Sequence, residues 1–101
     1  MRIKFKKNKQ REFIQKVLEI LNCPSLKELI FRGVSVNYSS LKNYFIEDYY
    51  LPLEFFNELI KLSGIDKNSL KFEIIEDNWG QIKGGEKGKF KYYLFFSFLY
   101  E

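Results

Sequence analysis

Residues that begin and end helices follow one another closely in the middle of this chain. Ser25 and Asn37 belong to the residue types that cap helix N-termini, and Pro52 belongs to the type favoured in a first helical turn, where its missing N–H loses no partner. Gly33 and Gly64 belong to the type that most often follows a helix, because glycine tolerates positive φ. This order predicts three short helices in succession.

Apolar periodicity places a further helix before these three, and strand-like segments lie near both ends of the chain. One face of a helix with Asn8 as its N-cap carries the apolar residues Phe13, Val17, Leu18, Ile20 and Leu21. Alternating charged and apolar residues over 1–5 indicate a short strand or an arm. The predicted fold is α+β in a single domain, 1–101, with a four-helix helix-turn-helix bundle over 9–63 and a small C-terminal β element, formed by 70–76 and 90–99, within a glycine-rich tail over 64–101.

The third of the four helices has a polar outer face. Helical spacing predicts that its inner face consists of Tyr38, Leu41, Tyr44 and Phe45. The same spacing predicts an inner face for the following helix of Leu53, Phe56, Leu59, Ile60 and Leu62. The outer residues of the third helix and its cap are hydrogen-bonding or cationic side chains of the kind that contact base edges and phosphates. The predicted nucleic-acid-binding residues on this helix are Asn37, Ser39, Ser40, Lys42 and Asn43.

Basic side chains gather near the two ends of the chain, around an acidic middle. Residues 1–11 hold six basic side chains and no acid, whereas residues 47–77 hold eight acids and three lysines. Two separate basic regions are typical of proteins that contact phosphates at two places, although a solvated lysine-rich surface has the same composition. The N-terminal region supplies the candidate phosphate contacts Lys4, Lys6, Lys7, Lys9 and Arg11.

A glycine-rich segment that contains the only tryptophan forms the second basic region. Its four glycines, between residues 80 and 88, let backbone N–H groups approach phosphate oxygens closely. The candidate phosphate contacts in this tail are Gln81, Lys83, Lys87 and Lys89. Trp79 has two interpretations that the residues leave open, stacking on a base or sugar and filling the core.

The composition disfavours several classes of function. Cys23 is the single cysteine and the chain has no histidine, so an internal disulfide and a Cys–His pair for nucleophilic catalysis are both excluded. The acid pairs Glu47–Asp48 and Glu76–Asp77 are typical of solvated turns, and we expect a non-catalytic protein without a metal or cofactor. No apolar run approaches the roughly 20 residues of a membrane helix, and the first residues do not resemble a signal peptide. These features predict a cytoplasmic protein.

Two short segments carry a resemblance to a known family. Leu41-Lys42-Asn43-Tyr44 corresponds to a recognition helix, and Leu51-Pro52-Leu53 corresponds to the start of the following helix, which begins at a proline. Through them, residues 9–63 resemble the Cro/repressor-type (XRE-like) helix-turn-helix family. The segment 32–36 is longer than the usual turn of that family, and Asp48-Tyr49-Tyr50 stands where the family often has glycine. The resemblance implies that the third helix lies in the major groove of DNA.

A narrower resemblance is carried by Asn78-Trp79-Gly80-Gln81-Ile82-Lys83-Gly84-Gly85. This segment is similar to the one that follows the helix-turn-helix in archaeal proteins with a LAGLIDADG-type homing endonuclease domain further on. In such proteins the helical module binds DNA and the later domain cuts it. The chain has no Asp-Gly pair at the end of an apolar helix and stops before such a domain. The resemblance implies a DNA-binding module without the cutting domain, which is either a stand-alone remnant of such a protein or a transcriptional regulator.

The expected function is therefore binding of duplex DNA, with RNA as the alternative nucleic acid and a homodimer as an additional expected assembly. A protein-interaction module is the rival class of function, in which the apolar residues 92–100 and Tyr49–Tyr50 form an oligomer or partner surface. Salt separates the two classes, because phosphate contacts weaken steeply as salt rises and apolar contacts do not.

Overall fold

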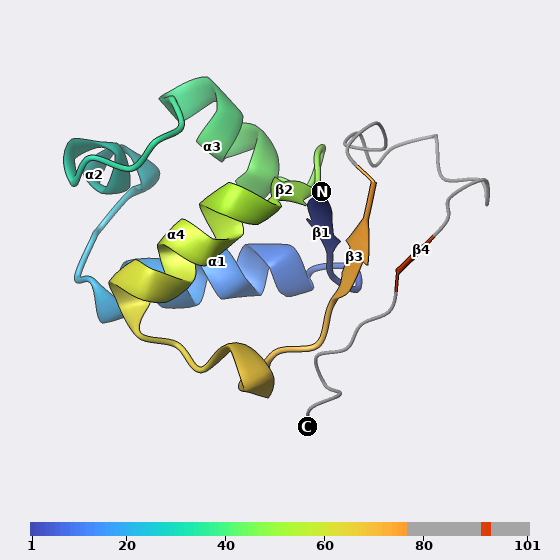
Figure 1. The fold of residues 1–101 in the computed structure, drawn as a ribbon. Coiled ribbons are helices and arrows are strands. Elements are labelled where there is room, and N and C mark those ends of the chain that lie inside the picture. Colours follow the sequence, from blue (N-terminus) through green and yellow to red (C-terminus); the bar gives the residue numbers. More distant parts are fainter. Residues whose placement is uncertain (77–91, 94–101) are drawn as a thin grey trace.

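Four α-helices pack against a small antiparallel sheet in the computed structural model, which describes residues 1–76 and the backbone of 92–93 (Figure 1). In chain order the elements are β1 (Arg2–Lys4), α1 (Lys9–Ile20), α2 (Leu26–Phe31), α3 (Tyr38–Phe45), β2 (Leu51–Pro52), α4 (Leu53–Ser63), the 3₁₀ helix η1 (Lys67–Ser69), β3 (Glu73–Ile75) and β4 (Tyr92–Tyr93). The α+β class and the four predicted helices are confirmed.

The sheet is organised around the N-terminal strand. Its strand order is β2-β1-β3-β4, and each neighbouring pair is antiparallel. Ile3 pairs with Leu51 on one side of β1 and with Ile74 on the other. Of the two interpretations of residues 1–5, a strand or an arm, the strand is therefore correct. The strand β2 was not predicted, because a strand of two residues is too short to show an alternating pattern. Most of the predicted 90–99 strand lies outside the described residues.

Ser25 and Asn37 cap their helices as the sequence predicts. The Asn37 Oδ1 atom accepts a hydrogen bond from the Ser40 N–H at 2.8 Å, and the Ser25 hydroxyl oxygen accepts one from the Glu28 N–H at 3.4 Å. Gly64 follows α4 with φ of +76°, a left-handed conformation that explains why glycine ends the helix. These local signals fix where α2 and α3 begin and where α4 ends.

The start of α1 is capped by a distant residue. Asn8 occupies the N-cap position, but its side chain makes no capping hydrogen bond and its backbone is left-handed, with φ of 72°. The carboxylate of Glu47 instead accepts hydrogen bonds from the N–H groups of Asn8 and Arg11, each at 2.9 Å. A carboxylate is well placed there because the N-terminal end of a helix is electropositive. The prediction that Glu47 is merely a solvated turn residue is wrong.

The core is aromatic, with Phe56 at its centre. Its ring centroid lies 5.0 Å from that of Phe72 and 5.3 Å from that of Phe13. Four predicted inward residues are buried and three are half-buried: Leu41, Tyr44, Phe56 and Leu59, and then Phe45, Leu53 and Ile60.

Three inward predictions are wrong. Ile20, the last residue of α1, is 44% exposed, Tyr38 is 40% exposed and Leu62 is 43% exposed. Phe55, in contrast, is buried although helical spacing does not assign it to the inner face. Tyr38 begins α3 and Leu62 lies in the last turn of α4. Periodicity assigns a helical face but cannot show how far along the helix the neighbouring elements reach, so terminal turns are where it errs.

The Asn37 cap gives a direct test of where α3 begins. Asn37→Ala should lower the free energy of unfolding by about 0.5–2 kcal/mol, because the Ser40 N–H loses its acceptor. Asn37→Asp, which keeps an acceptor oxygen, is the control and should stay close to the parent. Urea denaturation followed by circular dichroism measures both variants. An alanine variant as stable as the parent would contradict this cap.

Candidate nucleic-acid interface

The α2–turn–α3 segment, residues 26–45, lies on the side of the molecule away from η1 (Figure 1). α3 packs against both α2 and α1, so one of its faces is covered and the other is left to solvent. Leu41 and Tyr44 form the covered face and are buried. The arrangement is that of two successive helices joined by a turn, with the second helix presenting its outer side.

The predicted contact residues of α3 do not all have equal access to solvent. Ser39 and Lys42 are exposed, whereas Ser40 and Asn43 are half-buried. Asn37 is exposed, but its Oδ1 atom is occupied by the capping hydrogen bond, which leaves the amide NH₂ group as the part free to donate. Ser39 and Lys42 are therefore the side chains best placed to reach a ligand.

Sequence analysis missed two neighbouring side chains of this surface. Lys27 of α2 and Tyr38 of α3 are both exposed, and the Lys27 Nζ atom lies 5.5 Å from the centroid of the Tyr38 ring. Lys27 adds a cation beside the start of α3, and Tyr38 adds an aromatic ring with a hydroxyl group. The exposure of Tyr38 was hidden by its mistaken inward assignment, and its proximity to Lys27 depends on the angle between α2 and α3, which the sequence does not give.

The turn between α2 and α3 is fixed from behind by α4. The Glu58 carboxylate accepts a hydrogen bond from the Ser35 N–H at 3.0 Å and another from the Ser35 hydroxyl group at 2.6 Å. Charge-assisted hydrogen bonds of this kind are stronger than neutral ones. Through these two hydrogen bonds, Glu58 holds the segment 32–36 against the body of the protein.

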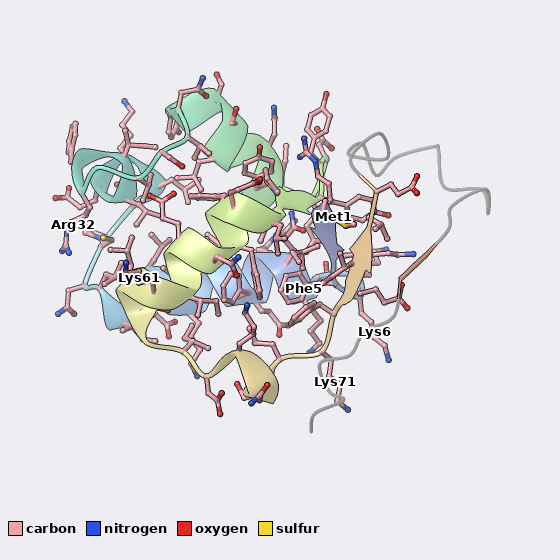
Figure 2. All side chains as sticks on the ribbon, viewed as in Figure 1. Met1, Phe5, Lys6, Arg32, Lys61 and Lys71 are labelled. Atoms are coloured by element: carbon pink, nitrogen blue, oxygen red, sulfur yellow. The ribbon has the colours of Figure 1, made fainter. Side chains whose placement is uncertain are left out.

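The N-terminal basic residues divide between two places. The Arg11 Nε–H donates to the Phe45 carbonyl oxygen at 3.2 Å, and its guanidinium lies 5.7 Å from the Phe45 ring centroid, so Arg11 joins the C-terminal end of α3. Lys4, Lys6 and Lys9 instead line hollows elsewhere on the surface, and Lys7 is exposed. In Figure 2, Lys6 lies well away from α3. The structure therefore gathers only part of the predicted set around α3.

The predicted tail contacts Gln81, Lys83, Lys87 and Lys89 lie outside the described residues, as does Trp79. Over residues 1–76, no cluster of three or more acidic or cysteine side chains offers a metal site. Cys23, the residue before Pro24, is buried and has no disulfide partner, since the chain contains no second cysteine. Among the helices described, none has the length and apolarity needed to cross a membrane.

Comparison with known proteins gives no assignment. The chain matches no protein-family model, no curated protein and no solved structure. The charge and geometry of the α2–turn–α3 surface are therefore the basis for a functional proposal.

Proposed function

We propose that this protein binds duplex DNA and that α3 enters the major groove. The observation that carries the proposal is the charge of the exposed α2–turn–α3 surface. Its exposed ionised side chains are the cations Lys27, Arg32 and Lys42, whereas its only acid, Glu28, is half-buried. An α-helix fits the major groove, and a cationic surface around it is attracted to the flanking phosphates.

The side chains around α3 divide naturally between base edges and phosphates. Ser39 and Lys42, on the exposed side of the helix, are proposed to reach base edges. Lys27 and Tyr38 lie beside the start of α3, and Arg11 lies beside its end, so these three are proposed to contact phosphates on either side of the groove. Kinship with the XRE-like family is part of this proposal and is supported by the same order of helices.

Rigid presentation of α3 supports the same proposal. The Ser35–Glu58 hydrogen bonds hold the turn before the helix, and the Asn37 cap fixes its first residue. A helix held at both its turn and its cap loses little conformational freedom on binding, which favours affinity. Glu58 is in this respect a positioning residue, since it acts on DNA only through the turn.

The test is the double variant Ser39→Ala/Lys42→Ala on mixed-sequence duplex DNA. Removing these two side chains should weaken binding by about 1–3 kcal/mol while the thermal midpoint stays nearly unchanged, because neither side chain is fully buried. Fluorescence anisotropy at several salt concentrations measures the affinity. The slope of log affinity against log salt should stay close to that of the parent, since Lys42 is proposed to reach base edges and not a phosphate.

Lys61→Ala is the matched control for this test, because Lys61 is an exposed lysine of α4 outside the α2–turn–α3 surface. It should retain nearly the parent affinity. If the double variant binds duplex DNA as tightly as Lys61→Ala, α3 does not lie in the groove and the proposal fails.

A further inference from the structure

A hollow with an aromatic floor and a lysine rim opens between the end of β1, the first half of α1 and the segment around η1. Its volume is about 470 Å³, within the range of roughly 300–1,000 Å³ that is common for small-molecule sites. Phe5, Phe13, Ile65 and Leu70 provide its apolar lining. Figure 2 shows Phe5, Lys6 and Lys71 together at this end of the molecule, away from α3.

The rim of the hollow carries a net positive charge. Four lysines, Lys6, Lys9, Lys16 and Lys71, stand against one acid, Glu12, so the balance is 4 − 1 = +3. The Glu12 carboxylate is 3.2 Å from the Lys9 Nζ atom, and these two charges offset each other. Within the described residues, Lys6, Lys16 and Lys71 make no ion pair, which leaves three ammonium groups for an anionic ligand.

A second hollow continues the same surface. It has a volume of about 530 Å³ and shares Phe5, Lys6 and Lys71 with the first, while Lys4 and Phe72 extend it. Among the described residues that line it, Glu73 is the only acid. The two hollows together form one aromatic and cationic track that extends from Lys16 and Leu70 past Phe5 to Lys4 and Phe72.

The Phe5 ring is held rigidly in the middle of this track. It stacks on Phe13 with centroids 5.6 Å apart and ring planes 24° apart, and its centroid lies 6.1 Å from those of Phe56 and Phe72. Phe5 is only half-buried, so part of the ring faces solvent in the hollow. A fixed, partly exposed ring can accept a stacked partner without losing rotamer freedom.

We propose that this track binds a single-stranded segment of nucleic acid, with an unpaired base stacked on Phe5 and neighbouring phosphates on Lys6 and Lys71. An aromatic platform beside a line of cations is the combination by which proteins hold single strands without reading their sequence. A fatty acid would also suit the apolar floor, but its single carboxylate leaves most of the lysines unmatched. The track lies away from α3, so this inference does not depend on duplex binding there.

The test uses fluorescence anisotropy with a labelled oligothymidylate of about ten nucleotides, a length within the usual range of single-strand sites. Phe5→Leu keeps an apolar side chain but removes the stacking surface, and it should weaken binding about fivefold or more. Lys6→Gln/Lys71→Gln should also weaken binding and make the salt dependence shallower, by roughly 0.7 for each phosphate left without its lysine. Lys61→Glu changes the net charge by the same amount at a distance from the track, and it should bind within about twofold of the parent.

An abasic strand of the same length separates stacking from a structural effect of the Phe5 substitution. The parent should bind it more weakly than oligothymidylate, and Phe5→Leu should leave its affinity unchanged, since there is no base to stack. Equal losses on both strands would overturn the role of Phe5. The inference also fails if Lys61→Glu weakens binding as much as the lysine pair does, or if the parent binds a fluorescent fatty acid but not oligothymidylate.

Discussion

Phe56→Ala is expected to lower the free energy of unfolding by about 3–5 kcal/mol, the usual cost of removing a buried phenyl ring. Phe56 has no exposed surface, and its ring contacts the aromatic cluster of Phe13 and Phe72 while the Lys67 Nζ atom lies 5.7 Å from its centroid. Domains of this kind have a total stability of only about 5–15 kcal/mol. The loss is therefore a large share of the total, and the variant should unfold at a clearly lower urea concentration than the parent.

Urea denaturation followed by circular dichroism measures this loss. Phe31→Ala is the matched control, because Phe31 is 77% exposed at the end of α2 and its removal should change stability by no more than about 0.5 kcal/mol. Similar losses for the two variants would contradict the position of Phe56 at the centre of the core.

Gln10→Glu is expected to have the second large effect, a loss of about 3–5 kcal/mol at neutral pH. Gln10 is 2% exposed, and its Nε2 group donates to the carbonyl oxygens of Tyr44 and Tyr49, each at 2.8 Å. Its Oε1 atom is buried without a hydrogen-bond partner among the described residues. An ionised carboxylate in the same place would be buried, unpaired and unable to donate to either carbonyl group.

Acidification should partly rescue Gln10→Glu. Burial and the two facing carbonyl groups raise the pKa of the introduced carboxyl group above its ordinary value of about 4.3. Below about pH 4.3 the introduced carboxyl group is protonated in both the folded and the unfolded state, so the folded variant contains no buried charge. This stability is lost as the pH rises through the raised folded-state pKa, because the buried group then ionises. The difference in unfolding free energy between parent and variant should therefore shrink as the pH falls.

Two further variants complete this test. Gln10→Met removes the donor without adding a charge and should lose only about 1–3 kcal/mol. Gln15→Glu makes the same chemical change at an exposed position of α1 and should stay near the parent at every pH. If Gln10→Glu is no less stable than Gln10→Met at neutral pH, then the side chain at position 10 does not lie in a buried site that penalises a charge.

Local sequence signals were sufficient for the helices because each signal acts within a few residues. Asn37 reaches the N–H of Ser40 and Gly64 adopts its left-handed conformation without help from distant parts of the chain. The alternation that predicts a strand over 1–5 also reflects a local rule, the change of face at each residue of a strand. For these elements the sequence alone is an adequate guide.

The candidate interface was predictable only in part. The outward positions of Ser39 and Lys42 follow from helical spacing, and the structure places both in solvent. The position of Lys27 beside Tyr38 does not follow from the sequence, because the residues that meet across a turn depend on the angle between two helices. The separation of Lys6 from α3 does not follow from it either, since charge counted along the chain contains no direction in space.

By itself, then, the sequence determined the four helices, the caps of α2 and α3, the first strand and part of the buried face of α1, α3 and α4, because these depend on contacts within one helical turn or on one face of an element. Only the tertiary structure decided that Glu47 caps α1, that Gln10 ties α1 to the end of α3, and that Glu58 holds the turn at Ser35. Each of these hydrogen bonds joins residues 23 to 39 positions apart. A polar side chain offers the same donors and acceptors wherever it lies, so its partner is set only when the fold brings the two together.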